Sequence, residues 1–132
     1  MTPPNRDLIV YRLQRARESL EDARILADAG RWNACVNRLY YACFYAVSAL
    51  LMQEGLSSAR HAGVRSLFNQ HFVRTGKISK EDARVFHDFF ERRQEGDYAD
   101  FVRFQEPKVR AWMSQAEAFV QLIASLPGVE QQ

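Results

Sequence analysis

The residues with the clearest potential for chemistry lie together near position 93. Over eight positions the chain reads Glu91-Arg92-Arg93-Gln94-Glu95-Gly96-Asp97-Tyr98. Arginine presents a planar fork that binds phosphate oxygens through paired hydrogen bonds, and a nearby phenol can add another. If Gly96 breaks a helix here, Tyr98 can turn back toward Arg92 and Arg93 and complete a phosphate site. On an unbroken helix Arg93 and Asp97 share a face instead, which predicts a structural salt bridge.

A second group of polar and aromatic residues recurs every four positions. Its members are Asn33, Asn37, Tyr41 and Tyr45, with Tyr40 and Phe44 beside them. This period places the four residues on one face of a helix. Two interpretations stay open. Asn37 and Tyr41 could line a ligand site, or the tyrosines could fill an interface between helices or subunits with their hydroxyls hydrogen-bonded.

Proton transfer has few candidates near the arginines. The only possible catalytic residues are Arg93, Asp97 and Tyr98, and ordinary carboxyl and phenol groups titrate near about pH 4 and 10, far from neutrality. We therefore assign no firm catalytic residue. The three histidines are scattered, and His87 with Glu91 makes only two potential ligands on one helix face. No glycine-rich phosphate loop is present. The sequence predicts neither a metal site nor a cofactor.

Length and composition indicate one ordinary globular domain. The chain has 132 residues, of which 47% are hydrophobic and 26% charged. The formal net charge of +2 is too small to indicate a polyanionic partner by itself. Fifteen of the eighteen basic residues are arginine. That bias suits phosphate binding, but codon usage in a GC-rich genome would produce it as well.

Two features bear on the compartment. Cys35 and Cys43 are eight positions apart in one predicted helix, a rise of about 12 Å that is too long for a disulfide. They are expected to be reduced core residues, as in a cytoplasmic protein. The N-terminus has no apolar signal core, and the longest apolar stretch, Leu39 to Met52, is too short and interrupted to span a membrane. We expect a cytoplasmic protein without membrane contact.

Hydrophobic spacing predicts helices throughout. They span approximately 5–29, 32–53, 58–72, 79–96 and 107–126, each with apolar residues at intervals of three and four. Gly30 and Gly55 are expected to end the first two, and Gly96 to end the fourth. A capping box at Ser79 starts the fourth. The prediction is an all-α, up-and-down antiparallel bundle of four main helices plus one short helix. It forms a single domain over 1–132, with its core at about 8–126.

Nearly the whole chain resembles the small stand-alone HEPN proteins. The resemblance rests on the order and spacing of five segments: Ser19–Arg24, Asn37–Phe44, His61–Val64, His71–Gly76 and Arg93–Tyr98. It implies a helical bundle that commonly dimerises, with two copies of the arginine motif across a shared cleft. It also implies a partner that is a minimal nucleotidyltransferase, often in a toxin–antitoxin pair.

One departure from the family pattern matters. Ribonuclease members of the superfamily carry an arginine followed, after four to six residues, by a histidine that moves a proton. No histidine follows Arg92 or Arg93. Arg65 and His71 have the spacing but lie outside the motif position, and six helical steps put them about 120° apart. His61 could line the cleft, although a place in the first turn of the third helix is the simpler interpretation.

The expected function is therefore a nucleotide- or RNA-binding module that pairs with a minimal nucleotidyltransferase in a toxin–antitoxin-type system. The ligand-binding candidates are Arg92, Arg93, Asp97, Tyr98, Asn37 and Tyr41. One alternative is an active, metal-independent ribonuclease toxin in which Asp97 or Tyr98 replaces the histidine. Another is a structural interaction protein without enzymatic activity, in which the arginines form salt bridges.

Overall fold

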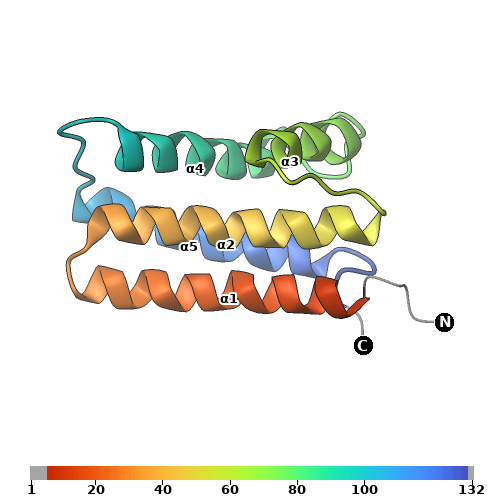
Figure 1. Ribbon diagram of the computed structural model, residues 1–132, viewed down its shortest axis with the longest axis horizontal. Coiled ribbons are helices and arrows are strands. Elements are labelled where there is room, and N and C mark those ends of the chain that lie inside the picture. The colour runs from red at the N-terminus through yellow and green to blue at the C-terminus, as the bar shows by residue number, and fades with distance from the viewer. Residues whose placement is uncertain (1–5, 131–132) are drawn as a thin grey trace.

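The computed structural model describes residues 6–130, and the residues in this range form helices and no strands. The elements are α1 (Arg6–Asp28), α2 (Trp32–Gln53), the short α3 (His61–Phe68), a π-helical turn (Asn69–Val73), α4 (Lys80–Tyr98) and α5 (Glu106–Ser125). The all-α class with four main helices and one short helix is confirmed (Figure 1).

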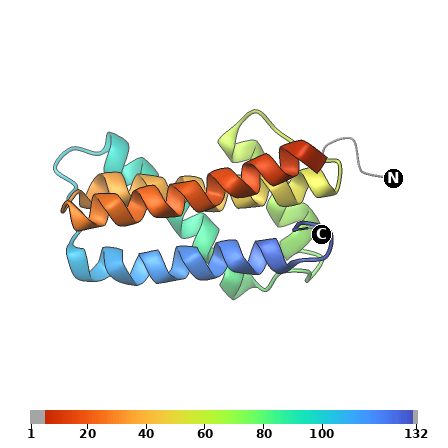
Figure 2. The same ribbon diagram turned by 90° about the horizontal axis from the view of Figure 1, so that it is seen from below.

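Helix α2 is the centre of the bundle. It packs against α1, α3, α4 and α5. In Figure 1 α2 lies between α1 and α4, and α5 runs behind it. Figure 2, seen from below, shows α1 and α5 side by side on the side of the bundle away from α4. Consecutive main helices run in opposite directions. One face of α2 is thus open between α1 and α4.

The predicted apolar stripes form the core. On α2 the whole stripe is buried: Val36, Leu39, Cys43, Val47 and Leu50. Helix α2 as a whole, which is longer than the Leu39–Met52 stretch, has the length and the apolar composition of a membrane span. Two thirds of its most apolar window (67%) is nevertheless buried inside the bundle. Burial by the surrounding helices accounts for its apolar character.

The predicted end of α4 at Gly96 was wrong. The helix continues to Tyr98, and Gly96 lies inside it. The need for glycine inside the helix is steric. A Cβ atom at position 96 would come within 2.8 Å of the Phe104 ring, which packs edge-on against Trp112 at 5.4 Å. Glycine at this position makes room for the loop that leads to α5, so it marks a close approach and not a helix end.

Other predicted boundaries were accurate. Gly30 follows α1 with φ +72°, as expected of a helix-ending glycine. The Ser79 hydroxyl accepts a hydrogen bond from the Asp82 backbone N–H at 3.1 Å, which starts α4. Helix α3 begins at His61, three residues later than predicted. The Ser58 side chain holds the preceding turn by hydrogen bonding the backbone of Arg60.

Candidate functional site

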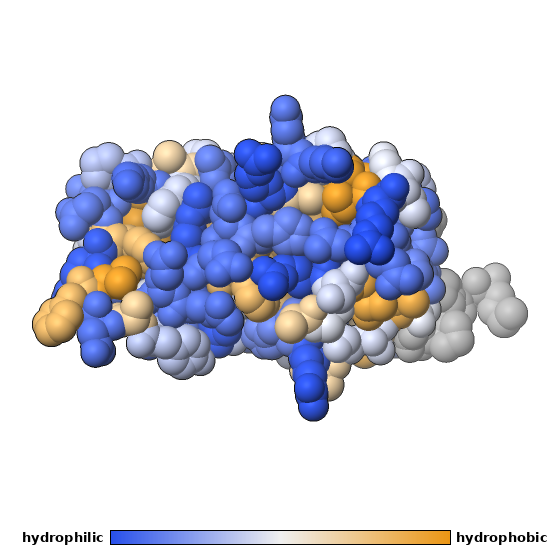
Figure 3. Space-filling view, turned by 90° about the horizontal axis from the view of Figure 1, so that it is seen from above, coloured by the Kyte–Doolittle hydropathy of each residue, from blue (hydrophilic) through white to orange (hydrophobic). Residues whose placement is uncertain are grey.

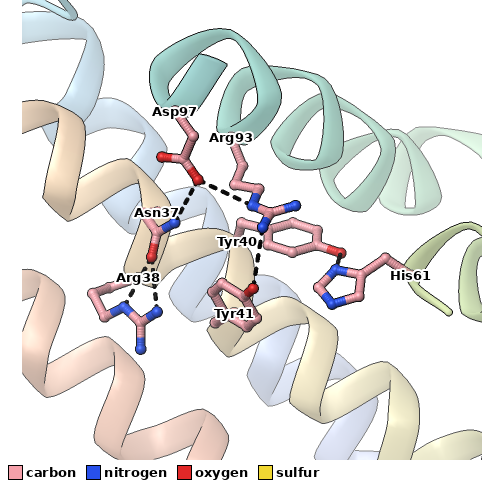
Figure 4. A network of polar contacts seen from close by, with 7 residues as sticks. All are labelled: Asn37, Arg38, Tyr40, Tyr41, His61, Arg93 and Asp97. Atoms are coloured by element: carbon pink, nitrogen blue, oxygen red, sulfur yellow. Dashed lines mark hydrogen bonds and ion pairs between the residues drawn. The ribbon is translucent and has the colours of Figure 1, made fainter. Parts of the chain in front are cut away.

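Seven side chains from α2, α3 and α4 meet at the open face of α2. We call them the Arg93 cluster, and Figure 4 shows them: Asn37, Arg38, Tyr40, Tyr41, His61, Arg93 and Asp97. The four-residue period of α2 places Asn37 and Tyr41 on its open face, where Arg93 and Asp97 reach toward them from α4. The structure therefore brings these four members of the predicted ligand-binding set together.

Arg93 is at the centre of the cluster. Its Nε lies 3.2 Å from Asp97 Oδ2, an ion pair whose angle falls outside hydrogen-bond geometry. Its Nη2 donates to the Tyr41 hydroxyl at 3.3 Å. The guanidinium lies within 5.7 Å of the ring centres of Tyr40, Tyr41 and Tyr98. Its side chain is 17% exposed, and among the described residues Nη1 has no hydrogen-bond partner. That group can donate to a ligand.

A chain of polar contacts joins α4 to α2. The Asn37 amide nitrogen donates to Asp97 Oδ2 at 2.9 Å. Arg38 in turn donates to the Asn37 amide oxygen through Nε and Nη2, at 3.1 and 2.7 Å. The Arg38 guanidinium also lies 4.7 Å from the centre of the Tyr41 ring. Both guanidinium groups lie near Tyr41, but within residues 6–130 only Arg93 is paired with a carboxylate, which leaves an excess of positive charge around Tyr41.

A shallow groove adjoins this chain of contacts. Its volume is about 470 Å³, and it is lined by Leu26, Asn33, Ala34, Asn37, Arg38, Gly96 and Asp97. The groove runs between α1 and the end of α4. Asn33 fixes its rim, because its side chain donates to the Val102 carbonyl and accepts from the Phe104 backbone N–H. Space for a ligand thus exists next to the charged groups.

His61 completes the cluster from α3. Its Nδ1 lies 2.8 Å from the Tyr40 hydroxyl, and its ring stacks on Phe44 at 4.4 Å. Burial, and then the charge of Arg93, lower the pKa of His61. Burial raises the pKa of the fully buried Tyr40, so its phenol stays protonated. The imidazole is therefore neutral at physiological pH.

The two neighbouring arginines have different surroundings. Arg92 stacks on Trp112 at 4.0 Å and lies 3.8 Å from Asp88, on the side of α4 that faces α5. Burial lowers the pKa of Arg92. It does not join the Arg93 cluster, and a ligand-binding role for it stays an untested prediction. Tyr98 is 73% exposed at the end of α4, near Arg93 but without a hydrogen bond to it.

Arg65 and His71, which have the spacing of the ribonuclease motif, do not come together. Arg65 donates to Glu91 at 3.2 Å and lies over the Phe90 ring at 3.9 Å. His71 lies in the π-helical turn, where its carbonyl accepts from the Thr75 hydroxyl. The two side chains therefore have separate neighbours.

The sequence did not identify Arg38 as a member of the cluster, and it left the place of His61 open. Arg38 follows Asn37 directly, and its position beside a polar stripe was a signal that could have found it. His61 does lie in the first turn of α3, but that turn is folded against Tyr40. Since 21 positions separate the two residues, no local pattern indicates their contact.

The chemistry of the cluster is that of hydrogen-bond donors. Within residues 6–130, no three histidine, cysteine or acidic side chains come together. Cys35 and Cys43 are both buried and unpaired, as predicted. Burial raises the pKa of the Cys35 thiol to about 11 and raises that of Cys43 as well, so neither is a thiolate. The donors of the Arg93 cluster suit phosphate, and His61 is its one side chain of a type that titrates near neutrality.

The fold and the cluster together define a class of protein, a small helical bundle with arginine, tyrosine and histidine gathered on its central helix. The family model of the HEPN domain matches residues 9–126, and the chain belongs to that family. A UPF0332 protein of Thermotoga maritima is 46% identical over 119 residues, which are 90% of each chain. A protein of Methanocaldococcus jannaschii named "Putative toxin MJ0605" is 31% identical over 118 residues, or 89% of this chain and 87% of that one.

Proposed function

We propose that the protein binds the phosphate of a nucleotide or of RNA at the Arg93 cluster, as one member of a pair with a minimal nucleotidyltransferase. The observation that carries the proposal is the state of Arg93. Two of its nitrogens hold it in place on Asp97 and Tyr41, while Nη1 has no partner among the described residues. A guanidinium that is oriented in advance loses little side-chain entropy on binding.

The relatives and the family resemblance support the wider context. Two relatives of this chain, both from Methanocaldococcus jannaschii, are named "Putative toxin". The pairing with a nucleotidyltransferase follows from the resemblance to small HEPN proteins and forms part of the proposal. The toxin–antitoxin role is likewise part of it, on the strength of those names and of that resemblance.

The test measures the binding of a short, fluorescein-labelled single-stranded RNA of mixed sequence by fluorescence anisotropy. Arg93→Ala should weaken binding about tenfold or more, because a charge-assisted contact contributes about 1.5–3 kcal/mol. Arg93→Lys should recover only part of the affinity, since lysine lacks the fork. Arg84→Ala is the matched control. It removes an exposed arginine from the same helix, and it should leave the affinity unchanged.

The rival is a purely structural ion pair, and the 3.2 Å approach of Arg93 to Asp97 favours it. Melting temperatures and RNA affinities of Arg93→Ala and Asp97→Ala, measured together, decide between the two. Because the side chains of Arg93 and Asp97 are 17% and 28% exposed, each substitution should cost about 1–2 kcal/mol of stability. The phosphate site predicts an additional loss of RNA affinity in Arg93→Ala. An unchanged affinity in Arg93→Ala, together with equal losses of stability, would leave only the structural role.

The ribonuclease alternative lacks a positioned proton-transfer group among Asp97 and Tyr98. Arg93 and Asn37 both engage the Asp97 carboxylate, and Tyr98 is exposed to solvent. We expect weak or absent RNA cleavage, measured on labelled RNA with a chelator present. Metal-independent cleavage that disappears in Arg93→Ala would establish the ribonuclease instead.

A further inference from the structure

The ring of His61 is held in one orientation by three aromatic neighbours. Tyr40 meets its Nδ1 at 2.8 Å, Phe44 stacks on its face at 4.4 Å, and Tyr41 meets it edge to face with ring centres 5.7 Å apart. The start of α3 is fixed as well. A Cβ atom on Gly63 would collide with Ser58, so only glycine allows this close turn. The remaining ring nitrogen, Nε2, therefore has a defined direction.

The hydrogen bond to Tyr40 determines which nitrogen carries the proton. Tyr40 is fully buried, and His61 is the single hydrogen-bond partner of its hydroxyl among the described residues. A buried hydroxyl proton without an acceptor is costly, so the phenol donates to Nδ1. A neutral imidazole that accepts at Nδ1 has its proton on Nε2. His61 thus offers an N–H donor on the side away from Tyr40.

The His61 ring and the Arg93 guanidinium lie against the same pair of rings. The Arg93 guanidinium lies 5.6 Å from the centre of Tyr40 and 5.5 Å from that of Tyr41. The His61 ring lies 5.7 Å from each of the same two centres. In Figure 4 Arg93 Nη1 points to the side of the cluster on which His61 lies. Neither Nη1 nor Nε2 has a hydrogen-bond partner among the described residues.

We infer that His61 is a second phosphate-binding residue of this site and that its Nε2–H and the Nη1 of Arg93 contact one phosphate group of the bound nucleotide or RNA. The inference rests on the proposed function and deepens it. Phosphate oxygens accept hydrogen bonds in several directions, so donors from two helices can share one group. Tyr40 is a positioning residue, because it acts on the ligand only through the tautomer of His61.

The experiment uses the same fluorescein-labelled RNA and two isosteric replacements. Asparagine places its amide nitrogen near Nδ1, and glutamine places it near Nε2. His61→Asn should weaken binding about tenfold, whereas His61→Gln should retain much of the affinity, because it preserves the donor. Tyr40→Phe should weaken binding by a smaller factor, because the tautomer is no longer fixed. His71→Asn is the control and should bind as the unaltered protein does.

A direct measurement keeps the test independent of variant stability. In the unaltered protein, saturating AMP should shift the imidazole NMR signals of His61, identified as those missing from His61→Gln. Unshifted His61 signals would overturn the inference, and so would equal affinities of His61→Asn and the unaltered protein. If Arg93→Ala weakens binding in that case, the proposed function survives without His61. If Arg93→Ala has no effect either, the proposed function fails too.

Discussion

At the scale of single residues, the difference between Arg92 and Arg93 shows how position on a helix assigns a role. Successive residues point about 100° apart on an α-helix. One step therefore turns Arg92 onto Trp112, between α4 and α5, and Arg93 onto the open face of α2. Both guanidiniums lie against aromatic rings, but only Arg93 lies beside a second guanidinium, a carboxylate and a histidine.

Acid should destabilise the fold through two histidines. Burial lowers the pKa of His61 and of His87, whose Nε2 lies 2.8 Å from Asn69 Oδ1. The unfolded chain then binds more protons, so stability is greatest above the unfolded pKa of about 6.5 and falls as pH drops below it. Urea unfolding between about pH 7.5 and 5.5 measures this.

The slope of stability against pH should become smaller in His61→Gln and in His87→Gln. His71→Gln is the comparison, because the ring of His71 makes no hydrogen bond with the described residues. An identical slope in His61→Gln and the unaltered protein would contradict the predicted sign of this pH dependence. Measurements at moderate salt keep surface ion pairs from dominating the result.

At the scale of elements, α2 contributes to both the core and the candidate site, with one stripe of residues for each. Its apolar stripe is buried against the other helices, and its polar stripe, which includes Asn37, Tyr41 and Tyr45, is half-buried. Asn33 holds the loop after α4, Asn37 holds Asp97, Tyr41 accepts from Arg93, and Tyr45 meets Arg15 at 3.5 Å. The Tyr41 and Tyr45 hydroxyls thus contact arginines between helices, whereas the groove is lined by Asn33 and Asn37 of the same stripe.

Gly96→Ala should destabilise α4 although alanine is the better helix former. The propensity gain is about 1 kcal/mol, but the added methyl meets Phe104 at 2.8 Å. Overpacking of this kind costs about 1–3 kcal/mol. In a Phe104→Ala background the same change should become stabilising, because the obstacle is gone. Thermal unfolding of the four proteins measures the coupling, and additive effects would show that no close contact exists.

At the scale of the whole molecule, the predicted homodimer remains a prediction, and part of the aromatic face that motivates it is covered within one chain. Tyr40 is buried within one chain, and His61 covers part of Phe44 and Tyr41. The outer face over α3 and α4 is mostly hydrophilic, with small hydrophobic patches toward its ends (Figure 3). What a partner subunit could still cover is the uncovered part of the open face of α2, around Tyr45.

Sedimentation velocity at micromolar concentration tests the dimer. We expect a particle of about twice the 15.3 kDa chain mass. Tyr45→Glu should convert it to monomer by placing a charge in the contact. Ile25→Glu should not, although Ile25 is exposed, because it lies on α1. A monomer in the unaltered protein would contradict the prediction, and an effect of Ile25→Glu alone would move the interface to α1.

The sequence by itself determined the helices, the core and, within the candidate site, which residues of one helix share a face. Apolar residues at intervals of three and four identify the buried stripes, and Ser79 starts α4, because these signals act over one or two turns. Asn37 and Tyr41 share a face for the same reason, as do Arg93 and Asp97. Only the tertiary structure decided that the two pairs meet, that Arg92 faces α5, and that Gly96 accommodates Phe104. His61 joins Tyr40 through helix packing, which brings together residues that no local periodicity relates.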